Sequence, residues 1–364
     1  MQVCDASRCA SCGKGPGGSA PFRLIYLCPG WDGPGGGIKV IYQHVEAIAG
    51  RGAPCFVFHP DTPGSSYTWM SHQVASLKLG HFDPGSDFLV FPEVWAALAA
   101  KFCIPAGIRY AIFVQNGYLA HRTAGFDFRT LAEAYSNATL VLSISNDTSE
   151  MLRLLFPDIG PDRIQRVHCR VPAAFAPAAK EPLITYMPRK LRDHAERLEI
   201  YLRNHLPGPW RMQALDGIPA RQVADAMGRS SIFLSLCDLE GYGLPPLEAA
   251  LCGNIVAGYT GQAAREYFER PIFREVPNGD FRLFVTEVQA AIRDVESGVP
   301  RSQAFTAQLA RIAATHSAEN EAFHLASFAE RAYGSVCAQA ALHLRPAWQA
   351  AASIDDVPAI LEVV

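Results

Sequence analysis

Short apolar segments alternate with longer segments of helical period along most of this chain, which is typical of parallel α/β proteins. Several of the apolar segments are continuous rather than alternating, and this indicates strands that are buried on both faces of a sheet. The strands expected in the first half are Arg23–Cys28, Pro54–Phe58, Asp87–Phe91, Tyr110–Gln115 and Thr139–Ser145, with a weaker one near Ile164–Val171. Those expected in the second half are Leu183–Met187, Arg211–Ala214, Ile232–Cys237 and Ile255–Ala257.

Helical segments fall between these strands and dominate the last part of the chain. They are expected at Gly37–Ala49, Glu93–Phe102, Asp147–Leu155, Lys190–Arg203, Pro219–Met227, Pro245–Leu251, Phe281–Glu296, Ser302–Thr315 and Ala318–Leu344. The segment Val171–Pro182 has three prolines and no period, which indicates a linker. The order predicts two doubly wound domains, 21–175 and 180–329, with a C-terminal helix of about 330–364 that rejoins the first.

Composition and charge restrict the class of protein. A length of 364 residues suits two domains, and 49 % apolar with 18 % charged residues is a globular composition. The net charge of −3 gives no basic excess, so we expect no nucleic-acid partner. We find no apolar stretch of membrane-spanning length and no apolar core of a secretion signal, and we therefore expect a cytoplasmic protein.

The ten cysteines are scattered, and several lie in apolar segments, which favours buried thiols in a reducing compartment over a disulfide framework. Cys4, Cys9 and Cys12 form the one cluster. Three thiolates are zinc ligands by type, but a structural site usually needs a fourth ligand and ordered flanks. Because a glycine-rich segment follows, we interpret residues 1–20 as a flexible tail.

The stretch Glu240-Gly-Tyr-Gly-Leu-Pro-Pro-Leu-Glu248 joins an expected strand to an expected helix. Gly241 and Gly243 permit close approach of the backbone to a ligand. Pro245 or Pro246 suits the first helical turn, where a missing N–H costs nothing. A helix N-terminus offers amide donors and a positive dipole end to an anion. Carboxylates that accept paired hydroxyls beside such a phosphate-binding loop indicate a sugar-nucleotide site.

This stretch resembles the E-x7-E signature of retaining GT-B glycosyltransferases, in particular glycosyltransferase family 4. The resemblance includes the glycine, aromatic, glycine, leucine and proline between the two acids and the small-residue helix that ends at Gly253. It implies a GT-B fold of class α/β, with two Rossmann-like doubly wound domains that face a cleft holding a nucleoside-diphosphate sugar. It also implies the donor contacts: Glu240 with the backbone of Gly241, Tyr242, Gly243 and Leu244 for the sugar hydroxyls, and Glu248 for the ribose.

A second glycine-rich loop follows the first strand, with Gly33, Gly35, Gly36 and Gly37 before a helix. A dinucleotide fingerprint would need G-x-G-x-x-G, but the register from Gly33 gives Gly35 and then Ile38. The loop resembles the N-domain loop of family 4 enzymes, which faces the donor diphosphate. The resemblance therefore implies a diphosphate contact at Gly36 and Gly37; the alternative is a flexible surface loop.

Arg189 and Lys190 are expected at the start of a helix, where cations oppose the macrodipole at a cost of about 0.3–1 kcal/mol. An anion bound between the two cations would make their net electrostatic contribution favourable instead of unfavourable. Their charges would stabilise the departing diphosphate more in the transition state than in the ground state. The same position in family 4 carries an Arg/Lys pair that contacts the pyrophosphate, although here the two residues are adjacent. Arg192 is a reserve candidate, and a solvated helix start is the alternative.

Further candidates follow other expected strands. The loop with Gly261 and Gln262 is similar to the family 4 loop that closes around the nucleotide. Asn116 stands where many members have a histidine near the donor sugar, so we assign it no acid–base role. Asn116, Tyr118 and Glu93 are candidates for the acceptor pocket, although a Glu at a helix start has a simpler explanation.

The sequence does not favour metal chemistry or a serine nucleophile. We find no D-x-D at a strand end, no His spacing typical of metal ligands and no G-x-S-x-G. We therefore expect a metal-independent hexosyltransferase that needs no cofactor beyond its nucleotide-sugar donor. The acceptor would be a glycan, a lipid-linked acceptor or a small molecule, with peripheral membrane contact at the inner face left open. The rival functions are a GT-B nucleotide-sugar epimerase or hydrolase and a non-catalytic sugar-nucleotide-binding protein; an oxidoreductase ranks third.

Overall fold

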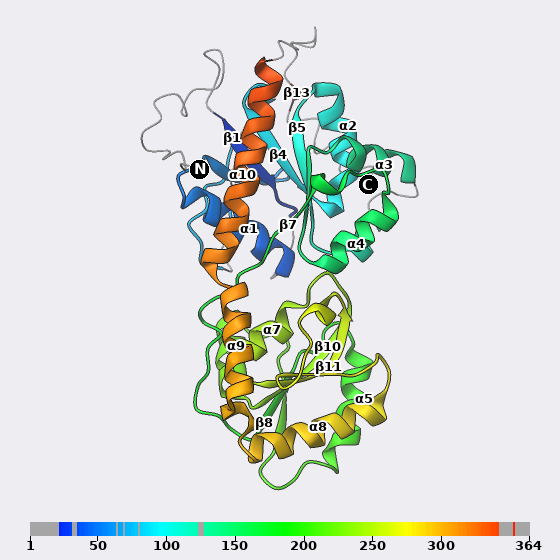
Figure 1. Cartoon of the computed structure of the whole chain (residues 1–364), viewed down its shortest axis with the longest axis vertical. Helices are drawn as coiled ribbons and strands as arrows, with labels where there is room; N and C mark the ends of the chain where they lie inside the picture. Colours follow the sequence, from blue (N-terminus) through cyan, green and yellow to red (C-terminus); the bar gives the residue numbers. More distant parts are fainter. Residues whose placement is uncertain are drawn as a thin grey trace. The chain divides into compact units, whose positions relative to one another are not determined.

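The computed structural model describes residues 22–30, 35–62, 65–67, 70–78, 81–122, 127–341 and 352–353 (Figure 1). They fall into two compact units. Unit 1 comprises the described parts of Met1–Ile144, Thr148–His168 and Glu321–Val364, and unit 2 comprises Ser145–Asp147 and Cys169–Asn320. The predicted tail with Cys4, Cys9 and Cys12 lies outside the described residues, as does Gly33.

Unit 1 is built on a six-stranded parallel sheet with the strand order β2-β1-β4-β5-β6-β7. Its strands are β1 (Arg23–Leu27), β2 (Cys55–Phe58), β4 (Asp87–Pro92), β5 (Arg109–Val114), β6 (Leu140–Ser143) and β7 (Ile164–Arg166). The helices of this unit are α1 (Gly36–Ala49), η1 (Glu93–Trp95), α2 (Ala96–Ala106), η2 (Gly117–Leu119), α3 (Phe128–Asn137), α4 (Asn146–Leu155), η4 (Pro161–Arg163) and most of α10 (Ala318–Ala341). A short antiparallel pair joins β3 (His81–Phe82) to β13 (Ala352–Ser353).

Alternate side chains of β1 serve the two faces of this sheet, as the period of two requires. Ile25 and Leu27 belong to the apolar core that the sheet shares with α2 and α3. On the opposite face Tyr26 meets the ring of His44 of α1, with centroids 5.9 Å apart, and that of Phe328 of α10, with centroids 6.5 Å apart. Both faces are therefore covered by helices, which explains the continuous apolar segments (Figure 1).

Unit 2 has a five-stranded parallel sheet with the order β12-β11-β10-β8-β9. Its strands are β8 (Leu183–Tyr186), β9 (Arg211–Ala214), β10 (Ile232–Glu240), β11 (Ile255–Gln262) and β12 (Phe273–Glu275). The helices are α5 (Arg192–Arg203), α6 (Ala220–Arg229), α7 (Leu244–Leu251), η5 (Ala263–Glu266), α8 (Phe281–Glu296), η6 (Val299–Arg301) and α9 (Gln303–Thr315).

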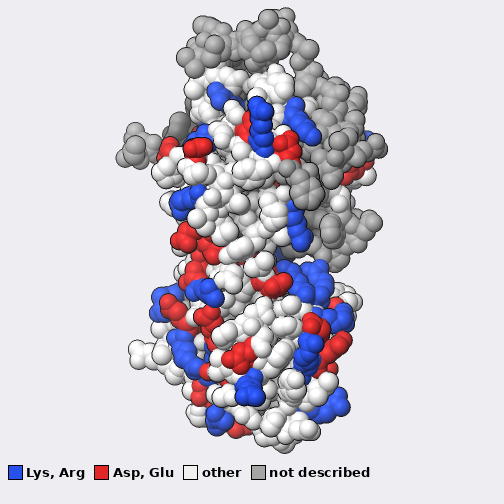
Figure 2. Space-filling model, turned by 90° about the vertical axis from the view of Figure 1, so that its right-hand side faces the viewer, with Lys and Arg blue, Asp and Glu red and all other residues white. Residues whose placement is uncertain are grey.

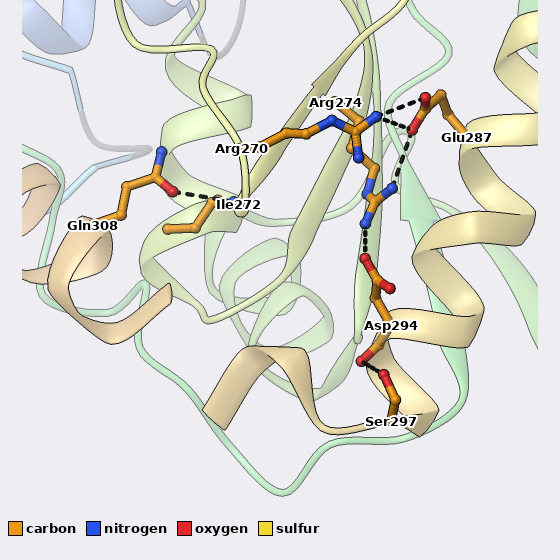
Figure 3. Close-up of polar contacts among 7 residues, drawn as sticks. All are labelled: Arg270, Ile272, Arg274, Glu287, Asp294, Ser297 and Gln308. Atoms are coloured by element: carbon orange, nitrogen blue, oxygen red, sulfur yellow. Dashed lines mark hydrogen bonds and ion pairs between the residues drawn. The ribbon is translucent and has the colours of Figure 1, made fainter. Parts of the chain in front are cut away.

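An ion network centred on the buried Arg274 fastens the edge strand β12 to α8 (Figure 3). The Arg274 side chain, only 2 % exposed, pairs with Glu287 at 3.1 Å and with Asp294. Arg270 donates to both carboxylate oxygens of Glu287, at 2.8 and 2.9 Å. A cation buried this deeply needs such partners, because an unpaired one would bear a large desolvation cost. Arg274 is therefore a structural cation and no candidate for binding a substrate.

The α/β class and the two doubly wound sheets predicted from the sequence are confirmed. Most predicted strands agree with the observed ones within a few residues. The strand Arg211–Ala214 and the helix Phe281–Glu296 agree at both ends. The missed elements include α3, β12 and the short strands β3 and β13. Among the described residues we find no helix with the length and apolar character needed to cross a bilayer.

Candidate active site

The strand order of unit 2 reverses between β8 and β10. The chain continues from β8 outward to β9, whereas from β10 it continues on the other side to β11 and β12. Loops that leave the carboxyl ends of the strands at such a point diverge, and ligands of open α/β sheets bind there. The loop after β8 carries Arg189 and Lys190, and β10 ends at Glu240. The topology alone therefore places the two sets of predicted donor contacts next to each other.

Lys190 and Glu240 form an ion pair between these two loops, from Nζ to Oε1. The Lys190 side chain is 46 % exposed and that of Glu240 is 16 % exposed. Pairs this accessible contribute about 0–1 kcal/mol to stability because solvent screens them. A multiply charged ligand can therefore recruit Lys190 at little cost, leaving the Glu240 carboxylate to accept hydroxyls.

The predicted start of the helix after β8 is wrong by two residues. α5 begins at Arg192 with Leu191 as its N-cap, so Arg189 and Lys190 lie in the preceding loop and not in the first turn. The supposed conflict with the helix dipole is correspondingly smaller. Arg192 does occupy the first turn, where its guanidinium donates to Asp216 at 2.6 Å.

The helix after the E-x7-E loop begins at Leu244, with Gly243 as its N-cap at φ 77° and ψ 66°. Because this left-handed conformation disfavours residues with a Cβ, a glycine is required there. Pro245 and Pro246 follow within the first turn, as the sequence predicted. Neither has an N–H. The amide donors that the loop can offer at this helix end are consequently concentrated at Gly243 and Leu244.

Glu248 lies in the second turn of α7, not in the first turn where the sequence placed it. It stands four residues after Leu244 and therefore on the same face of the helix, and helical side chains lean toward the N-terminus. The Cα–Cβ bond of Glu248 is thus tilted toward the end of α7 that carries Gly243, and the residue is 7 % exposed. The position no longer suits a simple first-turn dipole partner.

The side chain of Tyr242 belongs to the core and not to the loop surface. The residue is 4 % exposed, and its hydroxyl contacts Nε2 of the buried His316 at 3.1 Å. Any contact of Tyr242 with a donor would therefore come from its backbone. Tyr267 also contacts this loop through its hydroxyl, and no sequence pattern singles out either Tyr267 or His316.

The ends of β10 and β11 meet closely at Gly261. A Cβ there would lie 2.1 Å from the carbonyl oxygen of Asp238 and 2.9 Å from Cγ of Glu240, at φ 60°. The next residue, Gln262, has φ 75° and ψ −69° and is the one non-glycine residue of positive φ in the described part of the chain. These angles match the strained classic γ-turn. A hollow of about 70 Å³ adjoins this turn and is also lined by Cys237 and Asn278.

Backbone strain of this kind costs about 1–3 kcal/mol and persists where the surroundings enforce it, often at functional sites. We expect Gln262→Gly to raise the free energy of unfolding by about 1 kcal/mol, because relief of strain exceeds the added entropy of the unfolded glycine. The same change should lower the affinity for a nucleoside diphosphate. Urea unfolding and calorimetric titration measure the two effects, and Gln262→Ala, which keeps the strain, is the control for loss of the amide. A glycine variant that is less stable than the wild type would contradict the strain argument.

Cys237 lies within β10, and the charges of both Glu240 and Lys190 act on its thiol. Burial, reinforced by the charge of Glu240, raises the pKa of its thiol to about 12. The thiolate fraction at neutral pH is therefore negligible, and Cys237 is not suited to act as a nucleophile.

In unit 1 the strand order also reverses between β1 and β4, and Gly36 and Gly37, which belong to the described part of the predicted phosphate loop, follow β1 in the chain. α1 begins at Gly36, and the side chain of Gln115 donates to the carbonyl oxygen of Gly37 at 3.2 Å. A Cβ at Gly37 would lie 3.2 Å from Oε1 of Gln115. Gln115, which follows β5, thus contacts Gly37 at the N-terminus of α1, a role that was not predicted from the sequence.

The three candidates for the acceptor pocket lie together in unit 1, at the ends of β4 and β5. Glu93 is 5 % exposed; burial raises the pKa of its carboxyl to about 7, although amides of Gln115 and Asn116 oppose that rise. The side-chain oxygen of Asn116 accepts from the amide of Tyr118 at 3.0 Å and caps η2. Asn116 therefore has a local structural role, and Glu93 fixes the turn that carries it.

Surface charge and metal-binding geometry add two observations. On the face shown in Figure 2, Lys and Arg side chains are interspersed with Asp and Glu, and the described residues on that face form no broad basic area. Nor do the described residues contain a group of three or more His, Cys, Asp or Glu placed to hold a metal ion.

The comparisons with known proteins agree on the fold. No family model matches the chain. A curated α-1,6-glucosyltransferase of Actinobacillus pleuropneumoniae serotype 7 is 26 % identical over 144 residues, which cover 37 % of this chain and 43 % of that enzyme. The chain thus matches less than half the length of this relative.

Several solved structures match most of the chain at low identity. Sucrose-phosphate synthase from Thermosynechococcus elongatus has a TM-score of 0.63 at 14 % identity and covers 86 % of this chain and 100 % of its own. The lipopolysaccharide outer core galactosyltransferase WaaB has a TM-score of 0.59 at 14 % identity, with coverage of 86 % and 100 %. The catalytic domain of starch synthase IV from Arabidopsis thaliana, bound to ADP and acarbose, has 0.56 at 10 % identity, with coverage of 87 % and 99 %. The expectation from the E-x7-E motif is therefore confirmed for the fold: the chain has the GT-B fold and is similar to glycosyltransferases of the family 4 type.

Proposed function

We propose that this protein is a retaining glycosyltransferase that moves a hexose from a nucleoside-diphosphate donor to a hydroxyl acceptor. The observation that carries the proposal is the meeting of Lys190 and Glu240 at the strand-order reversal of unit 2, beside the N-terminus of α7. Each group suits one part of such a donor. A carboxylate accepts sugar hydroxyls, and a cation with backbone amides accepts a diphosphate.

The chemistry follows from where charge develops. As the glycosidic bond breaks, the departing diphosphate gains negative charge, and fixed donors nearby stabilise it more than they stabilise the bound donor. Lys190 and Arg189 would provide this charge. We assign the amides of Gly243 and Leu244 to the diphosphate as well, and not to the sugar hydroxyls as the resemblance implied, because they lie at the N-terminus of α7. Glu240 would hold the sugar and Glu248 the ribose. The diphosphate contact of Gly36 and Gly37 in unit 1 stays a prediction. The nucleotide contact of Gly261 and Gln262 stays a prediction as well.

Retention at the anomeric carbon is part of the proposal, because the E-x7-E resemblance implies it. The protonated Cys237 offers no nucleophile for a double displacement. Attack of the acceptor on the face that the diphosphate leaves, with a phosphate oxygen taking the proton, would give retention without one. We further propose that cations and amides of the protein perform the work that a metal ion performs in other transferases.

For the donor and the acceptor we propose chemical classes, and not a particular base, sugar or acceptor molecule. The starch synthase structure contains ADP, and a matching structure from Anabaena (12 % identity, TM-score 0.55) contains UDP. Both have a 2′-hydroxyl, which a carboxylate such as that of Glu248 can recognise. The proposed acceptor is a glycan, a lipid-linked sugar or a small molecule. The proposed location is the cytoplasm, with peripheral contact at the inner face of the membrane.

Product analysis tests this function against its two rivals. The protein is incubated with UDP-, GDP-, ADP- and TDP-glucose, with and without EDTA, and the products are followed by NMR. We expect slow release of nucleoside diphosphate from at least one donor, unchanged by EDTA, with the sugar first appearing in the donor's anomeric configuration. An isomerised nucleotide sugar would identify an epimerase instead, and stoichiometric binding without release would identify a binding protein.

A further inference from the structure

Tyr267 contacts the donor loop in an unusual way. Its hydroxyl lies 2.6 Å from the carbonyl oxygen of Gly243 and 3.1 Å from that of Tyr242. A carbonyl can only accept, so the hydroxyl is the donor in this shared interaction. Burial, with the nearby Cys237, Tyr242 and Glu240, raises the pKa of Tyr267 well above its ordinary value and keeps that proton in place.

Because the peptide bond is planar, this contact also determines the direction of the neighbouring N–H groups. In a trans peptide the C=O of one residue and the N–H of the next point in opposite directions. Because the carbonyls of Tyr242 and Gly243 both point at Tyr267, the amides of Gly243 and Leu244 both point away from it. These are the two amides left to serve an anion at this end of α7, since Pro245 and Pro246 have none.

The position of Gly243 shows that the contact is built into the loop. A Cβ at this residue would lie 3.0 Å from the Tyr267 hydroxyl and 3.4 Å from Cβ of Ala264, at φ 77°. A side chain at this position would thus be crowded by Tyr267 as well as strained by the backbone angle. The missing side chain lets the hydroxyl reach both carbonyls.

The neighbouring side chain is fixed from a second direction. The ring of Tyr242 lies against that of Tyr267, with centroids 5.5 Å apart, and its hydroxyl contacts Nε2 of His316 at 3.1 Å. Nδ1 of His316 lies 2.9 Å from the carbonyl oxygen of Cys169 and must carry a proton to donate to it. In the neutral ring Nε2 is then the acceptor for Tyr242. Residue 242 is held through its main chain by Tyr267 and through its side chain by His316.

We propose that Tyr267 is a positioning residue, supported by His316, that aims the Gly243 and Leu244 amides at the diphosphate of the donor. The proposal rests on the proposed function, since it takes this loop as the donor's anion site. In this role Tyr267 contacts the loop and not the substrate. It acts by holding the two peptide groups so that their N–H groups, and not their carbonyls, face the ligand. N–H dipoles held in place in this way stabilise charge that develops during the reaction.

Tyr267→Phe tests the proposal, with Tyr259→Phe as the matched control. Tyr259 is a buried residue of β11 in the same unit, and its hydroxyl contacts Nδ1 of His194 at 3.2 Å rather than the loop. The measurements are the unfolding midpoint, the Kd for UDP, GDP, ADP and TDP by calorimetry, and kcat and KM for donor hydrolysis. Because each variant loses one tyrosine hydroxyl and its hydrogen bond, their unfolding midpoints should fall by similar amounts.

We expect only Tyr267→Phe to weaken nucleoside-diphosphate binding and to lower kcat, each by about tenfold, the effect of roughly one misaligned charge-assisted hydrogen bond. Tyr242→Phe should show the same pattern with a smaller loss. Equal Kd and kcat in Tyr267→Phe and Tyr259→Phe would overturn the positioning role while leaving the transferase intact. If the wild type binds a nucleotide without turning it over, the transferase proposal fails, and the Kd values still decide the role of Tyr267. If the wild type binds none of the four nucleotides, both proposals fail.

Discussion

Replacement of Lys190 by alanine is expected to lower kcat by about 10²–10³-fold, the usual cost of removing one group that stabilises developing charge. Lys190 pairs with Glu240 at the strand-order reversal, and its charge is accessible to a ligand. The Michaelis constant should change less than kcat, because the leaving diphosphate carries more charge in the transition state than in the bound donor. Steady-state kinetics of donor hydrolysis or transfer measures both constants.

Two further variants make this result specific. Lys190→Arg keeps the charge and should recover a large part of the lost rate, although the guanidinium has a different shape. Arg197→Ala removes an exposed cation of α5 that pairs with Asp193 in the same helix, and its rate should equal that of the wild type. A Lys190→Ala protein that turns over as fast as Arg197→Ala would show that the leaving group is stabilised elsewhere.

Replacement of Gly258 by alanine is expected to lower the free energy of unfolding by about 3–5 kcal/mol, the sum of backbone strain and overpacking. A Cβ there would lie 2.2 Å from the carbonyl oxygen of Ser235 and 2.7 Å from Cζ of Phe284, at φ 137°. Ser235 is the partner of Gly258 in the β10–β11 ladder, so its carbonyl cannot move without loss of strand pairing. Urea unfolding followed by circular dichroism measures the change.

Gly298→Ala separates the two causes. Gly298 also has a positive φ, 85°, but a Cβ there would meet nothing within 4 Å. It should cost only about 1 kcal/mol, from backbone strain alone. If Gly258→Ala proves no more destabilising than this control, the close approach of α8 to the sheet at Phe284 is not as tight as described.

Where periodicity was strong, the sequence was sufficient to predict the fold. α8 agrees at both ends because Asp280 caps its first turn and Phe284, Val288, Ala291 and Ile292 recur at helical spacing. β12 was missed because three residues, Phe273–Glu275, are too few to show a period, and its place depends on pairing with β11. α3 was missed because only a narrow face of it, with Leu131, Ala134 and Tyr135, is buried.

The candidate site was predictable in its composition but not in its geometry. The acids of the E-x7-E stretch and the adjacent Arg189 and Lys190 stand out by residue type, and strand order then places them together. The roles of Tyr267 and His316 depend on tertiary contacts, at sequence separations of 24 and 74 residues from the loop atoms that they bind. A tyrosine in an apolar segment carries no signal of such a contact.

Lys180 illustrates the same limit at the linker. In the sequence it is one cation in a proline-rich segment, yet its Nζ donates to the carbonyls of Ser230, at 2.6 Å, and Cys252, at 2.5 Å. These residues end α6 and α7, where a cation complements the helix dipole. Burial nevertheless lowers the pKa of Lys180 to about 8. No local pattern predicts a residue that caps two helices at once.

The most direct measurement is calorimetric titration of the wild type and of Lys190→Ala with UDP, GDP, ADP and TDP. Our account predicts that the wild type binds at least one of them and that the alanine variant binds it at least tenfold more weakly, with an unchanged unfolding midpoint. Binding of equal strength by both proteins, or no binding by the wild type, would contradict the assignment of this loop pair as the donor site.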